Sequence, residues 1–217
     1  MSLAARNAYN NIRKAYAAKG RAPVTTMSTL RLVQNVVANK TTYSFPVIEG
    51  DSTNTLPENR FLNRADAFTA TSVGIFIGGL SDAGAAVTNG GYQLFGFQAP
   101  ALTTAGVTNA NALFQQSFMN VLVNNVAYLQ NFDTFRTYEA PVVQTGILMA
   151  TGGSATNQNS ITGYSGFSDL VPTLQFSGTA KIDITLNLPT SLVFTANCQI
   201  NLIFRGFLSL GASNLNK

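Results

Sequence analysis

Apolar and polar residues alternate along residues 173–188, "TLQFSGTAKIDITLNL". The apolar positions are Leu174, Phe176, Ala180, Ile182, Ile184, Leu186 and Leu188. The polar positions between them are Gln175, Lys181, Asp183, Thr185 and Asn187. A repeat of two residues is typical of a β-strand with one buried face, because successive side chains point to opposite sides. We expect one long strand here, or a strand with a bend near Gly178, ending before Pro189.

The same alternation returns near the end of the chain, in "NCQINLIFRGFLSL" at residues 197–210. Its predicted buried face holds Cys198, Ile200, Leu202 and Phe204. Its predicted polar face holds Asn197, Gln199 and Asn201. Cys198 is therefore expected to be a core residue and not a reactive thiol, since the sequence places no cationic partner beside it.

Six further segments have strand-like composition and are separated by Gly-, Ser- and Asn-rich turns. We place these strands at about 28–37, 41–48, 67–78, 91–98, 119–129 and 132–139. Residues 108–118, "TNANALFQQSF", open with a capping residue and predict one or two helical turns in a connection.

Eight strands without any alternation of strand and helix predict an all-β fold with antiparallel sheets. We expect an eight-stranded antiparallel sandwich of jelly-roll type that occupies residues 24–217 as one domain. An up-and-down barrel is the alternative.

The period changes before Pro23. Tyr9, Ile12 and Tyr16 recur at spacings of three and four residues, and Gly20 follows as a helix stop. This pattern predicts a short amphipathic helix over residues 3–19, inside an N-terminal arm of residues 1–23.

Positive charge is concentrated in this arm. Residues 1–40 contain seven basic and no acidic residues, whereas the other 177 contain six basic and nine acidic ones, which gives the chain its net charge of +4. A basic arm on a near-neutral body is expected when one end meets a polyanion, most commonly nucleic acid. The predicted nucleic-acid-binding residues are Arg6, Arg13, Lys14, Lys19 and Arg21.

The apolar positions of the predicted helix, Tyr9, Ile12 and Tyr16, are expected to contact a neighbouring subunit, and the two tyrosines have base stacking as a second role. A helix that docks onto its own domain is one alternative. A helix lying on a membrane surface is another, weakened by the absence of Trp and Phe from the helix.

Composition argues against enzymatic chemistry. The chain has no His and a single Cys, and its nine carboxylates are scattered, so no usual general base, nucleophile pair or metal-ligand set is present. We expect no catalytic residues, no metal and no cofactor. No apolar run is long enough for a membrane helix or a secretory signal, so we expect synthesis in the cytoplasm.

Only 10% of the residues are charged, and a sparsely charged surface favours association with other copies of the chain, with an extracellular β-domain as the alternative. The densest mixed-charge segment, "PENRFLNRADAF", contains Glu58, Arg60, Arg64 and Asp66. These residues are predicted to lie at a subunit interface, with a local salt-bridged turn as the alternative. Arg136 and Arg205 lie within strand patterns and are expected at subunit contacts or sheet edges, or on a solvated surface.

The basic segment "RNAYNNIRKAYAAKGR", followed by the predicted sandwich with Asn- and Thr-rich loops, resembles viral jelly-roll capsid proteins in layout. The resemblance implies a virion structural protein, preferably of a bacterial virus, that self-assembles into a shell. It also implies that the arm faces the genome or neighbouring subunits, so the expected partners are copies of the chain, genomic nucleic acid and other virion proteins. A decoration or receptor-binding protein attached to a virion is the alternative.

Overall fold

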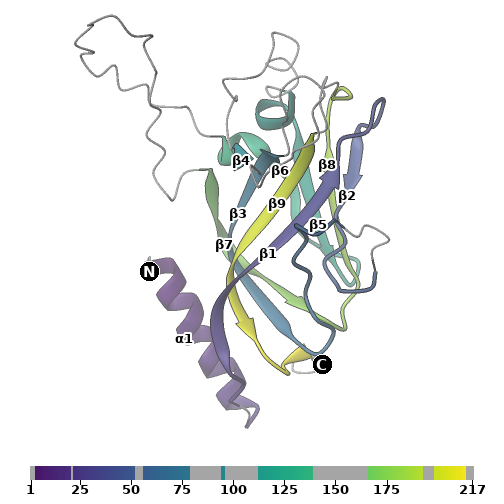
Figure 1. Cartoon of the computed structure of the whole chain (residues 1–217). Coiled ribbons are helices and arrows are strands. Elements are labelled where there is room, and N and C mark those ends of the chain that lie inside the picture. Colours follow the sequence, from purple (N-terminus) through teal and green to yellow (C-terminus); the bar gives the residue numbers. More distant parts are fainter. Residues whose placement is uncertain are drawn as a thin grey trace, which may run out of the picture.

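The computed structural model of the chain is a sandwich of two antiparallel β-sheets with one long helix on its outside (Figure 1). It describes residues 3–20, 22–51, 56–78, 94–95, 112–138, 166–192 and 198–213. The predicted all-β sandwich is confirmed.

The two sheets have different sizes. The larger sheet has the order β1-β9-β3, with β7 and the short β4 both pairing with the far side of β3. Its strands are β1 (Thr25–Asn35), β3 (Ala67–Gly78), β4 (Leu94–Phe95), β7 (Phe167–Ser177) and β9 (Gln199–Ser209). The smaller sheet has the order β2-β8-β5-β6. Its strands are β2 (Thr42–Ser44), β5 (Phe118–Val123), β6 (Val126–Asp133) and β8 (Ile182–Asn187).

The helices of the described residues are few. The long helix α1 (Leu3–Ala18) confirms the prediction over 3–19, and the chain leaves it through Gly20 at a φ of +67°. A φ of this sign suits glycine, which ends many helices in the left-handed conformation. The 3₁₀ helix η2 (Thr134–Thr137) follows β6, and residues 112–115 form the helical turn expected in 108–118, whose first residues lie outside the described part.

The core lies between the sheets and is built from the alternating residues that the sequence indicated. The predicted buried faces of 173–188 and 197–210 are confirmed, because their apolar residues belong to one buried cluster, with Ile182 partly exposed at its margin. The rings of Phe176 and Phe204 pack edge to face in this core, with centroids 5.4 Å apart. The outer face of β9 is also covered. Asn201 was predicted to face water, but it is fully buried.

Several strand boundaries differ from the prediction. Residues 173–188 form two strands, because the chain turns at residues 178–181 and passes from the larger sheet to the smaller one. Residues 119–129 form a hairpin in which Asn124 and Asn125 have φ values of +51° and +64°. Positive φ at both central residues is typical of a two-residue hairpin turn that matches strand twist.

Other segments are shorter or shifted. The strand predicted at 132–139 lies at 126–133, and only residues 42–44 of the predicted 41–48 form a strand. The strand predicted at 28–37 begins at Thr25, whereas that at 67–78 coincides with β3. Of the strand predicted at 91–98 only β4 is described, and Asn197 lies outside the described residues.

Candidate nucleic-acid interface and subunit surfaces

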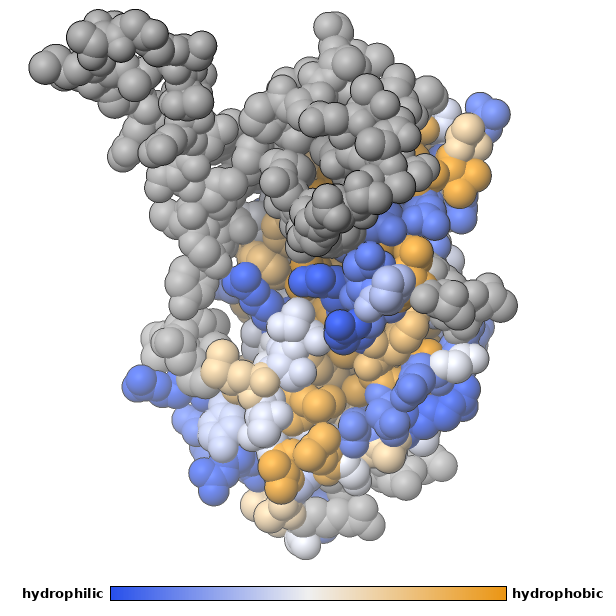
Figure 2. Space-filling model, in the orientation of Figure 1, coloured by the Kyte–Doolittle hydropathy of each residue, from blue (hydrophilic) through white to orange (hydrophobic). Residues whose placement is uncertain are grey.

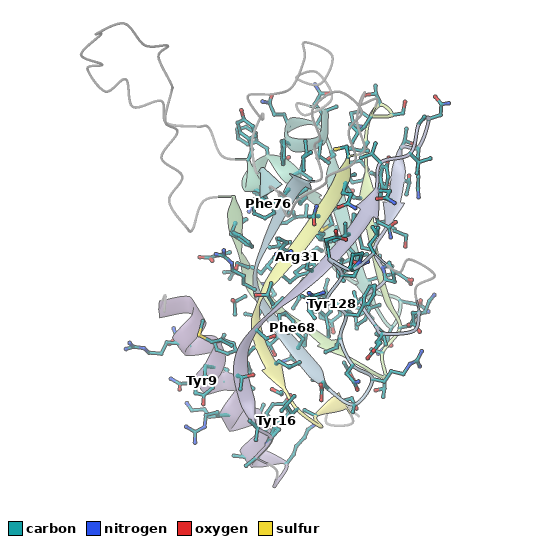
Figure 3. The ribbon with its side chains drawn as sticks, viewed as in Figure 1. Tyr9, Tyr16, Arg31, Phe68, Phe76 and Tyr128 are labelled. Atoms are coloured by element: carbon teal, nitrogen blue, oxygen red, sulfur yellow. The ribbon has the colours of Figure 1, made fainter. Side chains whose placement is uncertain are left out.

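Helix α1 packs on the outer face of the larger sheet. Its residues Ala8 and Ile12 are buried against Phe207 of β9, and the Tyr9 ring lies 5.5 Å from the Phe207 ring, centroid to centroid. Tyr16, which is labelled in Figure 3, packs against Ala67, at the start of β3, and against Ala212. One stripe of the helix therefore holds it to its own sheet.

The exposed surface of α1 beside and opposite this stripe is basic. Arg6, Arg13 and Lys14 all face solvent, and the helix contains no acidic residue. Arg6 and Arg13 are seven residues apart, about two helical turns, so they lie on one flank. The Arg13 guanidinium lies 5.9 Å from the centre of the Tyr9 ring. We call Arg6, Arg13 and Lys14 the basic face.

The other two predicted binding residues lie beyond this face. Lys19 is exposed just after the end of α1, and Arg21 lies outside the described residues.

The docking of α1 changes the expected role of its apolar residues. Ile12 is only 4% exposed, and both tyrosines are half-buried against their own sheet, so packing within the chain accounts for all three. The alternative of a helix docked on its own domain is therefore what the structure shows. Contact of Tyr9, Ile12 and Tyr16 with a neighbouring subunit stays a prediction.

The mixed-charge segment at 57–68 does not gather its four charges into one network. The Arg64 guanidinium pairs with Asp51 at 2.5 Å, and both side chains are well exposed. Asp66 accepts a hydrogen bond of 2.8 Å from the backbone N–H of Gly211.

The rest of this segment is held by backbone contacts. Arg60 donates to the carbonyl oxygens of Pro57 and Asn59, each at 2.7 Å. Among the described contacts Glu58 has no ion pair with either arginine. A local turn is thus directly visible, while a role of these residues at a subunit interface stays a prediction.

Arg136 and Arg205 have different surroundings from those expected. Arg136 lies in η2 and not in a strand, and its guanidinium is 5.8 Å from the centre of the Phe132 ring. Arg205 does lie in a strand, but β9 is an inner strand between β1 and β3 and not a sheet edge. Its guanidinium covers the Phe167 ring of β7 at 3.6 Å. Sequence alone did not reveal this contact, because the two residues are far apart along the chain.

An open cleft of about 450 Å³ lies where the end of α1 meets the β5–β6 hairpin and the β7–β8 turn. Its walls include Lys19, Tyr128, Gln175, Ser177 and Thr179. These groups offer hydrogen bonds and one cation but no acid–base pair. In the residues that the structure describes, no group of His, Cys, Asp or Glu could hold a metal ion. Within the same residues, no helix is long and apolar enough to cross a membrane.

Cys198 is buried in the core, as expected, and burial raises the pKa of its thiol to about 12. We expect no reaction with a disulfide reagent at pH 8 while the protein is folded, and full reaction in denaturant. Because the unfolded thiol loses its proton near pH 9 and the folded one near 12, rising pH across this range favours the unfolded state. Replacing Cys198 with alanine should remove that part of the pH dependence, measured by denaturation at pH 8 and pH 10.5. Rapid labelling of the folded protein would contradict the burial.

Comparison of the chain with protein-family models, with curated proteins and with solved structures gives no match. The order of the strands and the placement of charge on α1 are therefore the features of the molecule that bear on its function.

Proposed function

We propose that this chain is a virion structural protein with a jelly-roll fold, which assembles with copies of itself and directs α1 toward nucleic acid. The pairing of the strands is the observation that carries the fold. With the short β4 set aside, the first strand pairs with the last, β1 with β9, and the second with the next to last, β2 with β8. The third and sixth pair as β3 with β7, and the fourth and fifth as β5 with β6. Such nesting describes one long hairpin rolled into two sheets, which is the arrangement of jelly rolls found in many capsid proteins.

The distribution of charge supports the functional half of the proposal. The basic face of α1 is exposed and lacks acidic neighbours within the helix, whereas the sandwich carries few charges. Several large apolar side chains of the sandwich are exposed, among them Met27 at 71% and Val126 at 59%. An exterior of this kind suits contact with other copies on some sides and with a polyanion on the side of α1.

The docked helix also limits how nucleic acid is recognised. Tyr9 and Tyr16 pack against the sheet, so part of each ring is already covered and less of it is left to stack on bases. Arg6, Arg13 and Lys14 remain to contact phosphates, which carry no base information. We expect binding that depends steeply on salt and little on base sequence.

Assembly is tested by purifying the full chain and measuring its mass by size-exclusion chromatography with light scattering, followed by electron microscopy. Closed particles with a surplus of absorbance at 260 nm would support a shell that holds nucleic acid. A discrete trimer or a monomer at all concentrations and salts would overturn the proposal and favour the decoration protein.

Charge removal tests the role of α1. We expect the triple variant Arg6→Gln, Arg13→Gln, Lys14→Gln to keep its thermal stability, because all three side chains are exposed. It should lose nucleic acid affinity, and the slope of log K against log salt should fall in magnitude by about 2 to 3. The charge-conserving variant Arg6→Lys, Arg13→Lys is the matched control and should keep the slope. An unchanged slope in the glutamine variant would remove α1 from the interface.

A further inference from the structure

In the part of the chain that the structure describes, and apart from the short β4, four strands form sheet edges, and three of these edges carry features that block pairing with another strand. At the edge of the smaller sheet, β2 is only three residues long. At its other edge, β6 pairs with β5 through two irregularities, and Asn131 has a φ of +52°. At the far edge of the larger sheet, β7 contains Pro172 and has a shifted register against β3. Short strands, bulges and proline are the means by which sheets protect their edges.

The fourth edge, formed by β1, is protected over only part of its length by the residues that the structure describes. From Arg31 onward it is covered, because Arg31 and Arg60 exchange backbone hydrogen bonds of 3.2 and 2.7 Å. The Val33 N–H donates to the side-chain oxygen of Asn59 at 2.7 Å. The segment before Arg31, Thr25–Leu30, pairs with β9 without any irregularity and contains no charge and no proline. We call residues 25–30 the open edge.

The hydrogen-bond pattern shows which backbone groups of the open edge face outward. Val24 and Val36 form hydrogen bonds to the residues that flank β9. The Val24 carbonyl accepts from the Leu210 N–H, and the Val36 N–H donates to the Cys198 carbonyl. Even-numbered residues of this strand therefore face β9. Arg31 and Val33 bond to the other side, so odd-numbered residues face away from the sheet. The N–H and C=O groups of Thr25, Met27 and Thr29 thus point outward.

We propose that the open edge pairs antiparallel with the open edge of a second copy of this chain, with Met27 opposite Met27 across a two-fold axis. In this register the outward groups of Thr25, Met27 and Thr29 all meet outward groups, whereas a shift by two residues toward Pro23 would place Thr29 opposite a residue that has no N–H. Thr25 faces Thr29 of the second copy on both sides of the axis, and about six hydrogen bonds form between the chains. A shift by one residue would place outward groups opposite inward ones, and a shift toward Arg31 would meet groups already bonded to Arg60.

The chemistry of the segment favours a copy of itself as the partner. No residue from Ala22 to Leu30 is charged, so the symmetric contact opposes no like charges, and Arg31 falls opposite Pro23. The contact would cover exposed apolar side chains of β1 and its flank, namely Val24 at 63% and Met27 at 71%. Figure 2, which has the orientation of Figure 1, shows apolar residues gathered on the lower half of the visible face.

The geometry of this contact also agrees with the proposed function. Its place in a shell rests on that proposed function. A two-fold axis that joins two sheets edge to edge runs perpendicular to them, so both α1 helices lie on the same face of the joined sheet. Both basic faces then point to one side. The helix packs on Phe207 of β9 and on Ala67 of β3, which leaves Met27 exposed.

A single introduced cysteine tests the register. In the full-length variant Met27→Cys the two thiols would sit on strands whose Cα atoms are about 5.5 Å apart, within the range that a disulfide spans. Cys198 is buried and should not compete. Under mild oxidation we expect covalent dimers at least about tenfold faster than in the control Val126→Cys, because pairing holds the thiols at a high effective concentration. Val126 is also an exposed apolar residue, but it lies in the bulged β6.

A second pair of variants tests whether the contact matters to association. Met27→Lys places two like charges at the axis and should abolish the dimer, as measured by light scattering, whereas Val37→Lys, at another exposed apolar position, should not. Equal cross-linking at positions 27 and 126, or a cysteine at 27 that reacts only with another protein, would overturn the proposal. If particles form but the cross-link does not, the edge contact is wrong and the proposed shell stands. If cross-linked dimers form but never assemble into particles, the proposed shell is wrong and the edge contact stands.

Discussion

Replacing Gly206 with alanine is expected to lower the free energy of unfolding by about 3 kcal/mol, the largest effect of an added methyl group among the glycines that the structure describes. Gly206 lies in β9 opposite Ala70, where the register between β3 and β9 shifts. A Cβ at this position would overlap the carbonyl oxygen of Thr69 and lie 2.8 Å from its carbonyl carbon. Backbone atoms of a paired strand cannot move away without breaking the pairing of β3 with β9 at the centre of the larger sheet.

Chemical denaturation monitored by circular dichroism measures this loss. Gly211→Ala is the matched control, because a Cβ there meets nothing within 4 Å and only the positive φ of +65° is unfavourable. We expect about 1 kcal/mol for that change. Similar losses in the two variants would show that the contact with Thr69 does not limit the packing of the strands.

The sequence pattern predicts elements well where one face of an element meets the core. The helix predicted over 3–19 was recognisable because apolar residues recur with a helical period. The strand at 67–78 was recognisable from its composition, although β3 is buried on both faces and its apolar residues do not alternate. Alternation does not say to which sheet a strand belongs, so the passage from β7 to β8 was missed. The pair Asn124–Asn125 was an available signal for the β5–β6 hairpin, since asparagine tolerates positive φ.

The candidate interface was predictable only in part, for a similar reason. The exposure of Arg6, Arg13 and Lys14 follows from their place outside the apolar stripe of α1. What covers that stripe does not follow from the local sequence, because its partner Phe207 lies near the other end of the chain. The open edge of β1 was hidden too, as it depends on where residues 59 and 60 pair with β1.

The second large effect is expected from Phe207→Ala, which removes the main contact of α1. Phe207 is 2% exposed and packs against Ala8, Tyr9 and Ile12. Truncating a buried Phe costs about 3 to 5 kcal/mol, and here the loss falls on the docking of α1. An undocked helix of 16 residues is only marginally stable in water. Trypsin should therefore cleave after Arg13 and Lys14 at least about tenfold faster than in the wild type. Phe135→Ala, at an exposed ring, is the control and should leave cleavage unchanged.

The same variant separates the charge of α1 from its position. Phe207→Ala keeps Arg6, Arg13 and Lys14 but releases the helix that presents them, whereas the glutamine variant keeps the helix and removes the charge. Since the salt dependence of binding counts phosphates neutralised, the slope in Phe207→Ala should stay close to that of the wild type. Assembly should suffer instead, because the two helices no longer lie fixed on one face of the joined sheet. If the slope in Phe207→Ala falls as far as in the glutamine variant, docking on β9 is what brings the three charges together. If trypsin cleaves Phe207→Ala at the wild-type rate, Phe207 does not hold α1 on the sheet.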